Sequence, residues 1–171
     1  MTVEDGERLR AAAVRYSTQG WPIVPTCPVT GRLVCTRPPD GPETAHEWWS
    51  DKPYGIACLT GTQFDALQVP QWLGQRVLPG MPHLAAVIEV RRPLDCDWYF
   101  LITPGSPTIT ELPRLTTGVR HHGAGHWIAL PPTENALWVS RQADLRLPHS
   151  LTVQWAVVRA AIASRSPPRG H

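Results

Sequence analysis

Residues 54–74 decide the fold, and they read YGIACLTGTQFDALQVPQWLG. Two short apolar runs, 56–59 and 66–69, flank a break at Thr60-Gly61-Thr62. Short apolar runs around a glycine-containing break are typical of two strands joined by a tight turn. Pro70 closes the second run because proline cannot donate a backbone hydrogen bond to a sheet. The stretch predicts the centre of a small α/β domain.

The flanking segments predict further strands and two terminal helices. Strands are expected at 21–24, 83–90, 97–103, 126–130 and 136–140, with 83–90 and 97–103 joined as a hairpin. Short helices are expected at 44–49, capped by Thr44, and at 71–77. Thr2 and Asp5 resemble a capping box, and Gly20 ends the helix that they begin. Its buried face has the i, i+3, i+4, i+7 pattern of Leu9, Ala12, Ala13 and Tyr16, and the C-terminal helix after Ser150 shows a similar pattern in Leu151, Trp155, Val158 and Ile162.

Length and composition favour one folded α/β domain. The chain has 171 residues, 42% of them apolar, with eight tryptophans. Its 19 prolines and 13 glycines indicate short elements joined by many turns. We predict a domain over 1–164, with a mixed or antiparallel central sheet, flanking N- and C-terminal helices and one core, followed by a flexible tail over 165–171.

Charge and cysteine content limit the classes of protein. The net charge is only +2, so the overall balance does not require a nucleic-acid partner. No segment approaches the ~20 apolar residues of a membrane span, and the acidic N-terminus is unlike a secretion signal. We therefore expect a cytoplasmic protein with no membrane partner. Its four cysteines are then expected as thiols or metal ligands, and Cys58, inside a predicted strand, as part of the core.

Several motifs occur in the order found in one known family. Residues 20–25 read GWPIVP, residues 55–61 read GIACLTG, and Tyr99-Phe100 and Pro131-Pro132-Thr133 follow. This order, over residues 8–135, resembles the bifunctional DNA primase/polymerase N-terminal domain, a branch of the archaeo-eukaryotic primases. The resemblance implies a primase/polymerase-like fold and an ancestral role in DNA replication in bacteria.

The resemblance also implies where catalytic residues would stand, and this chain departs from the family at each such position. The family's Asp-x-Asp pair falls on Gln68 and Pro70, its nucleotide-contacting His on Asp97, and its third-motif Asp on Arg120. Nucleotidyl transfer of this class needs two divalent metals held by converging carboxylates. Gln68 is at best a neutral ligand, proline has no side-chain donor, and arginine repels a metal. We expect polymerase and primase activity to be absent.

Two clusters could carry replacement chemistry. Asp95 and Asp97 enter a strand with their carboxylates on the same side, and Glu89 lies on the other arm of the hairpin. The second cluster surrounds a glycine turn, where backbone N–H groups and basic side chains could bind phosphate. It consists of Arg120, His121, His122, Gly123, Gly125 and His126. We expect each cluster to be structural instead, as a charge at the end of a strand or as a hairpin turn with polar side chains.

A zinc site is a further alternative in the loop 26–43. Cys27 and Cys35 lie in this loop, and His46 is the nearest third ligand. A structural zinc site needs four ligands and usually a closer cysteine pair. We therefore expect free thiols and no cofactor. The alternative is zinc bound in this loop, or a divalent metal bound at Asp95 and Asp97.

The sequence predicts a binding or regulatory module derived from a primase/polymerase domain. An unknown protein is the expected partner, and nucleic acid or a nucleotide is possible. The alternative is an enzyme with a relocated active site. Any binding is expected on the face that carries Gln68, Asp97 and Arg120, where Arg120 would favour an anionic group. We expect instead that Arg120 pairs with Asp97 and closes this face, because an unpaired, partly buried charge is costly.

Overall fold

The stretch 54–74 forms two strands that belong to different sheets. A computed structural model describes residues 2–81, 86–105, 107–109, 112, 116–140 and 146–165. Strand β2 (Gly55–Leu59) lies in a three-stranded sheet of order β1-β2-β7, and β3 (Asp65–Pro70) lies in a five-stranded sheet of order β6-β3-β5-β4-β8. Neighbouring strands are antiparallel throughout both sheets. The turn after Leu59 therefore carries the chain from one sheet to the other.

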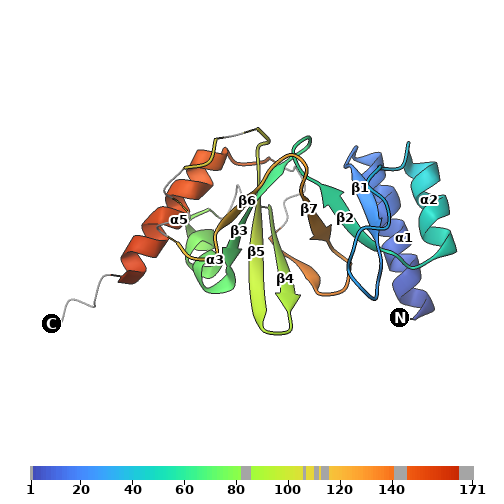
Figure 1. Cartoon of the computed structure of the whole chain (residues 1–171), viewed down its shortest axis with the longest axis horizontal. Coiled ribbons are helices and arrows are strands. Elements are labelled where there is room, and N and C mark those ends of the chain that lie inside the picture. Colours follow the sequence, from blue (N-terminus) through green and yellow to red (C-terminus); the bar gives the residue numbers. More distant parts are fainter. Residues whose placement is uncertain are drawn as a thin grey trace.

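The remaining elements confirm a single α/β domain with antiparallel sheets and flanking helices. Helices α1 (Val3–Thr18) and α2 (Pro42–Asp51) lie at one end of the molecule, and α3 (Gln71–Val77) and α5 (Ser150–Arg165) at the other, with the sheets between them (Figure 1). A 3₁₀ turn, η1 (Leu78–Gly80), follows α3. The other strands are β1 (Ile23–Thr26), β4 (Ala86–Arg92), β5 (Asp95–Ile102), β6 (Arg120–His122), β7 (Trp127–Leu130) and β8 (Ala136–Ser140). No helix in the described ranges is long and apolar enough to span a membrane.

Two turns that connect the two sheets lie side by side. The chain passes from β2 to β3 through Gly61 and from β6 to β7 through Ala124. The Thr60 backbone N–H donates to His126 O at 3.0 Å, and the Thr60 hydroxyl donates to Gly123 O at 2.5 Å. Gly61 has φ +100°, and a Cβ at this position would lie 2.4 Å from the Ala124 Cα. Only glycine fits there, because both the backbone angle and the close approach exclude a side chain.

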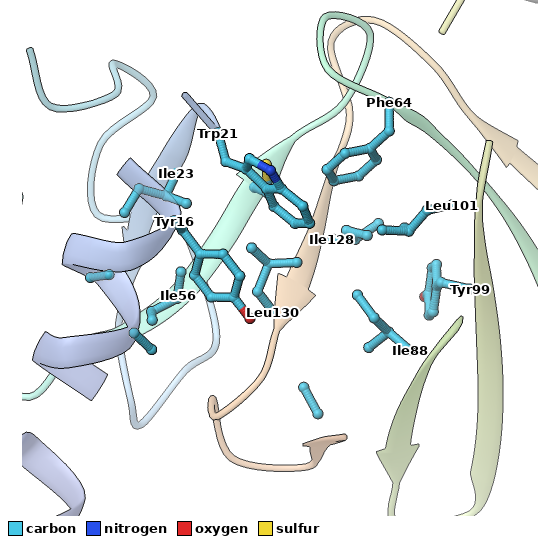
Figure 2. Packing of buried hydrophobic residues seen from close by; sticks show 14 of the residues in the cluster. Tyr16, Trp21, Ile23, Ile56, Phe64, Ile88, Tyr99, Leu101, Ile128 and Leu130 are labelled. Atoms are coloured by element: carbon cyan, nitrogen blue, oxygen red, sulfur yellow. The ribbon is translucent and has the colours of Figure 1, made fainter. Parts of the chain in front are cut away.

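The first hydrophobic cluster packs α1 against both sheets (Figure 2). Tyr16 is fully buried, stacks on Trp21 with a ring-centroid distance of 5.1 Å, and donates its hydroxyl hydrogen to Pro131 O at 2.7 Å. The Trp138 Nε1–H donates to the same Tyr16 hydroxyl at 3.3 Å. As expected, strands β2, β3, β4, β5 and β7 all contribute residues to this cluster. These residues include Ile56, Cys58, Ala66, Ile88, Tyr99, Leu101, Ile128 and Leu130.

A second cluster covers the opposite face of the five-stranded sheet, so the prediction of one core is wrong. Leu67 and Val69 point into this cluster together with residues from α3 and α5. Gln68 lies between them in the strand and points to the other face, because side chains alternate along a strand. Strands β3, β4 and β5 are therefore covered on both faces, so they supply apolar residues at consecutive positions.

The structure corrects the predicted orientation of the C-terminal helix. Trp155 and Ile162 are 56% and 55% exposed, so of the four residues expected to form the buried face only Val158 is buried. The buried side is formed by Val153, Gln154, Val157, Val158 and Ala161. Because α5 is apolar on most sides, spacing alone could not select the face that packs.

Element boundaries differ from the predicted ones at a few places. Helix α2 begins at Pro42, after Gly41, so Thr44 is not its cap. Proline suits the first turn of a helix because its missing N–H would be unpaired there anyway. Strand β1 begins at Ile23, two residues later than expected. Residues 83–85 of the predicted fourth strand and residues 166–171 of the predicted tail lie outside the described residues.

Candidate functional site

Gln68 is the centre of a buried polar network on the face of β3 that points toward the first cluster. Its side-chain Nε2 donates to Asp97 Oδ2 at 2.7 Å, and its Oε1 lies 2.8 Å from His122 Nε2. An amide oxygen can only accept, so His122 Nε2 carries the hydrogen in this pair. Gln68 is thus held from both sides, by a residue of β5 and a residue of β6.

Asp97 is paired with Arg92, which corrects the expected pairing with Arg120. Arg92 Nη1 lies 3.2 Å from Asp97 Oδ2, and Arg92 Nη2 donates to the Tyr99 hydroxyl at 3.1 Å. The Asp97 side chain is 4% exposed and that of Arg92 is 51% exposed. Arg92 could have been found from the sequence, because the tight turn of the predicted hairpin places it opposite Asp95 on the same face as Asp97.

Arg120 is exposed at the edge of the same face. It lies directly opposite Gln68 in the pairing of β3 with β6. Among the described residues its side chain forms no hydrogen bond and no ion pair within 4.0 Å. Burial raises the pKa of Asp97, and the charge of Arg120 opposes a small part of this rise. Arg120 therefore leaves an exposed positive charge at this edge.

Burial shifts the protonation of the network toward neutral forms. It raises the pKa of the Asp97 carboxyl above its usual value, and the Arg92 guanidinium opposes part of this rise. Burial, with a smaller contribution from the neighbouring His126, lowers the pKa of His122 to about 4. His122 is therefore a neutral imidazole at pH 7, and its hydrogen bond to Gln68 places the ring hydrogen on Nε2.

The residues at this face do not fit a pair of divalent metals. The only carboxylate of the Gln68 network is Asp97, and its Oδ2 already accepts from Gln68 and forms an ion pair with Arg92. Pro70 lies opposite Asp97 in the pairing of β3 with β5 and offers no ligand atom. Within the described ranges, no three His, Cys, Asp or Glu side chains lie close enough together to hold a metal ion.

The histidines divide between the two faces of β6. His122 lies 5.5 Å from His126 between ring centroids and 5.6 Å from Tyr99, on the Gln68 face. His121 points to the opposite face, where its Nε2 lies 3.3 Å from Asp65 Oδ2. The candidate cluster is therefore divided, because His121 does not lie on the same face as His122 and His126. Asp65, which the sequence did not single out, also accepts from the Gly105 backbone N–H at 3.0 Å.

The glycine turn is packed against its neighbour. Gly123 O accepts from Thr60, and the His126 backbone N–H donates back to Gly123 O at 3.2 Å. Gly125 has φ +84°, which explains the glycine at that position. The contacts of this turn hold the two sheets together.

The hairpin acids are separated as well. Glu89 points to the second cluster, where it accepts from Arg91 Nε at 2.6 Å and from Trp98 Nε1 at 2.9 Å. Asp97 points to the other face, and Asp95 is exposed. Glu89 therefore cannot join Asp95 and Asp97 in one site.

The cysteines of the loop 26–43 also lie apart along a short hairpin. The Cys27 backbone N–H donates to Arg32 O, and the Val34 N–H donates to Pro25 O. This register places Cys35 beyond Pro25, away from Cys27. The Cys35 thiol donates to Arg37 O at 3.4 Å, and His46 is exposed on α2 beside Ser50.

Comparison with known proteins adds no relative. No protein-family model matches this chain, and no curated protein matches it either. The resemblance to primase/polymerase domains therefore depends only on the order of the motifs in the sequence.

Proposed function

We propose that the protein is a catalytically inactive relative of the primase/polymerase domain that works as a binding or regulatory module. The observation that carries this proposal is the Gln68 amide, held between Asp97 and His122 where the resemblance implies a metal-binding carboxylate. A protein is the first candidate partner, and a nucleic acid is the second.

The contacts of the network support loss of catalysis. Two-metal nucleotidyl transfer needs several ionised oxygens that converge on the metals. Here one buried carboxylate, Asp97, is neutralised by Arg92, and an amide replaces the next. Arg120 adds positive charge at the third position, which would repel a cation.

The geometry also weighs against an enzyme with a relocated site. Glu89 and Asp97 point to opposite faces of the five-stranded sheet, and so do His121 and His122. General acid–base chemistry needs its groups within hydrogen-bond reach of one substrate. Each candidate cluster is therefore divided between the two faces of the sheet.

Nucleic acid is kept as a second candidate partner because of Arg120. This exposed arginine lies on the Gln68 face near the exposed His126, and the half-exposed Arg92 lies on the same face but on β4. Arginine is well suited to bind phosphate through paired hydrogen bonds. Binding of this kind weakens steeply with salt because phosphate contacts release counterions.

Two assays test the proposal. Purified protein is given a primed template, dNTPs or NTPs, and Mg²⁺ or Mn²⁺, and no incorporation is expected. Incorporation that a chelator abolishes would overturn the proposal.

Fluorescence anisotropy with a labelled single-stranded oligonucleotide then separates the two classes of partner. If nucleic acid is the partner, binding weakens with salt and Arg120→Ala reduces it, whereas the exposed control Arg146→Ala does not. If the oligonucleotide does not bind, the nucleic-acid candidate is wrong and a protein partner remains.

A further inference from the structure

A groove beside α2 combines aromatic walls with two unpaired carboxylates. Its volume is about 370 Å³, and it lies between α2 and the loop segment near Val34. The apolar and aromatic lining includes Pro25, Val34, Trp48 and Tyr54, and the carboxylates are those of Glu47 and Asp51. None of these residues belongs to the Gln68 network, so the groove is a separate site.

The two carboxylates lack a neutralising partner. Glu47 and Asp51 are exposed and lie four residues apart on α2, which places them on the same side of the helix. In the described part of the chain neither forms an ion pair, and no basic side chain lines the groove. The nearby Arg37 is paired with Asp40 at 2.9 Å.

This arrangement is unfavourable for the helix by itself. Like charges at i and i+4 repel each other. Asp51 also lies in the last turn of α2, which contains no basic residue, and the helix dipole disfavours an anion there. Residues that destabilise the helix or strand to which they belong are expected at functional sites.

We propose that this groove binds an arginine side chain of a protein partner. Trp48 and Tyr54 are half-buried and line the groove as aromatic side chains that a flat cation can contact, and Glu47 and Asp51 supply oxygens for its N–H groups. A guanidinium fits both features because it is planar and donates two parallel hydrogen bonds to a carboxylate, whereas an ammonium is a compact and strongly hydrated charge. A nucleic acid is a poor occupant, since its phosphates would be repelled by both carboxylates.

The test is a titration of the full chain with three matched peptides, followed by NMR. The probes are N-acetyl-Gly-Gly-X-Gly-Gly-amides in which X is arginine, lysine or the neutral isostere citrulline. The arginine peptide is expected to bind with a dissociation constant on the order of 1 mM and to shift the indole N–H signal of Trp48. The citrulline peptide is expected to bind at least about tenfold more weakly, because it lacks the charge.

Three single substitutions on one helix assign the binding residues. Glu47→Gln and Asp51→Asn are each expected to weaken binding of the arginine peptide about fivefold to tenfold. Glu43→Gln is the matched control, because Glu43 lies one turn before Glu47 on α2 but does not line the groove, and it should change binding less than about twofold. Asp51→Asn is also expected to raise the thermal unfolding midpoint, since it removes the unfavourable charge at the end of the helix.

Several outcomes would overturn the proposal. The charge-based argument is wrong if the citrulline peptide binds as well as the arginine peptide, or if none of the peptides shifts Trp48 at concentrations well above 1 mM. Equal binding of the lysine peptide would contradict the assignment to a guanidinium. A lower unfolding midpoint for Asp51→Asn would show that Asp51 supports the fold and is not maintained for binding.

Discussion

The side-chain amide of Gln68 donates to Asp97 Oδ2 at 2.7 Å, and this bond joins neighbouring strands of the five-stranded sheet. The two residues are diagonal neighbours, because Gln68 lies opposite Tyr99 and Asp97 lies opposite Pro70. Both are buried, at 6% and 3% exposure. A neutral amide can stabilise a buried carboxylate, whereas a second carboxylate at position 68 would repel it.

Restoring an acid at position 68 is expected to destabilise the protein. Gln68→Glu places a second carboxylate beside Asp97 and removes the donated hydrogen bond. The free energy of unfolding at pH 7 should fall by about 1–3 kcal/mol, as measured by urea denaturation. The exposed control Gln63→Glu should change it by less than about 0.5 kcal/mol. Equal stability of both variants would show that Gln68 and Asp97 do not interact in solution.

Stability is expected to fall in mild acid because of His122. Its folded-state pKa of about 4 lies below the ordinary value of 6.5, so the unfolded chain takes up the proton first as pH decreases. Stability is therefore complete above pH 6.5 and is lost progressively between pH 6.5 and about 4. We expect about 1–2 kcal/mol from this group, less than the full shift implies, because the imidazole is partly exposed.

Denaturation at pH 7 and pH 5 measures this effect. In His122→Gln the loss between the two values should be smaller than in the wild type. The exposed control His46→Gln on α2 should keep the wild-type pH dependence. An unchanged pH dependence in His122→Gln would contradict the assignment.

The two arginines of the Gln68 face should differ in their effect on stability. Arg92→Ala leaves the buried Asp97 without its ion pair and should lower the free energy of unfolding by about 1–2 kcal/mol, since half of the Arg92 side chain is in solvent. Arg120→Ala removes an exposed side chain and should cost less than about 0.5 kcal/mol. Thermal denaturation of the two variants in parallel checks this order. The reverse order would mean that Arg120, and not Arg92, neutralises Asp97.

Because the turns at Gly61 and Ala124 are in close contact, the loss of stability on replacing a glycine is expected to depend strongly on its position. Gly61→Ala should lower the free energy of unfolding by more than about 2 kcal/mol, because its φ is +100° and a Cβ would contact the Ala124 backbone. Gly31 is the matched control, with φ +67° and no atom within 4 Å of the added carbon. Gly31→Ala should cost about 1 kcal/mol from the backbone angle alone. Similar losses in urea denaturation would show that the turns at 61 and 124 are not in close contact.

The amino-acid sequence predicted elements whose signals are local. The capping box at Thr2 and Asp5 is formed, with the Asp5 backbone N–H donating to the Thr2 hydroxyl at 3.2 Å. The apolar spacing of α1 correctly identified its buried residues, because polar side chains occupy its other faces. The last strand, Ala136–Ser140, has the predicted bounds. Burial of Cys58 was likewise predicted from its place in a short apolar run, and that burial raises its pKa.

Features that depend on distant partners were decided by the tertiary structure. The local sequence does not show that β2 and β3 belong to different sheets, because a pattern that predicts a strand does not predict which strand pairs with it. The face of α5 could not be chosen by spacing, since two apolar faces compete and only packing against the second cluster selects one. The ion pair of Asp97 with Arg92 is different, because both residues belong to one hairpin and lie only a few residues apart. Residue types and spacing therefore determined which segments form helices and strands, whereas contacts between segments far apart in the chain decided sheet membership and buried faces.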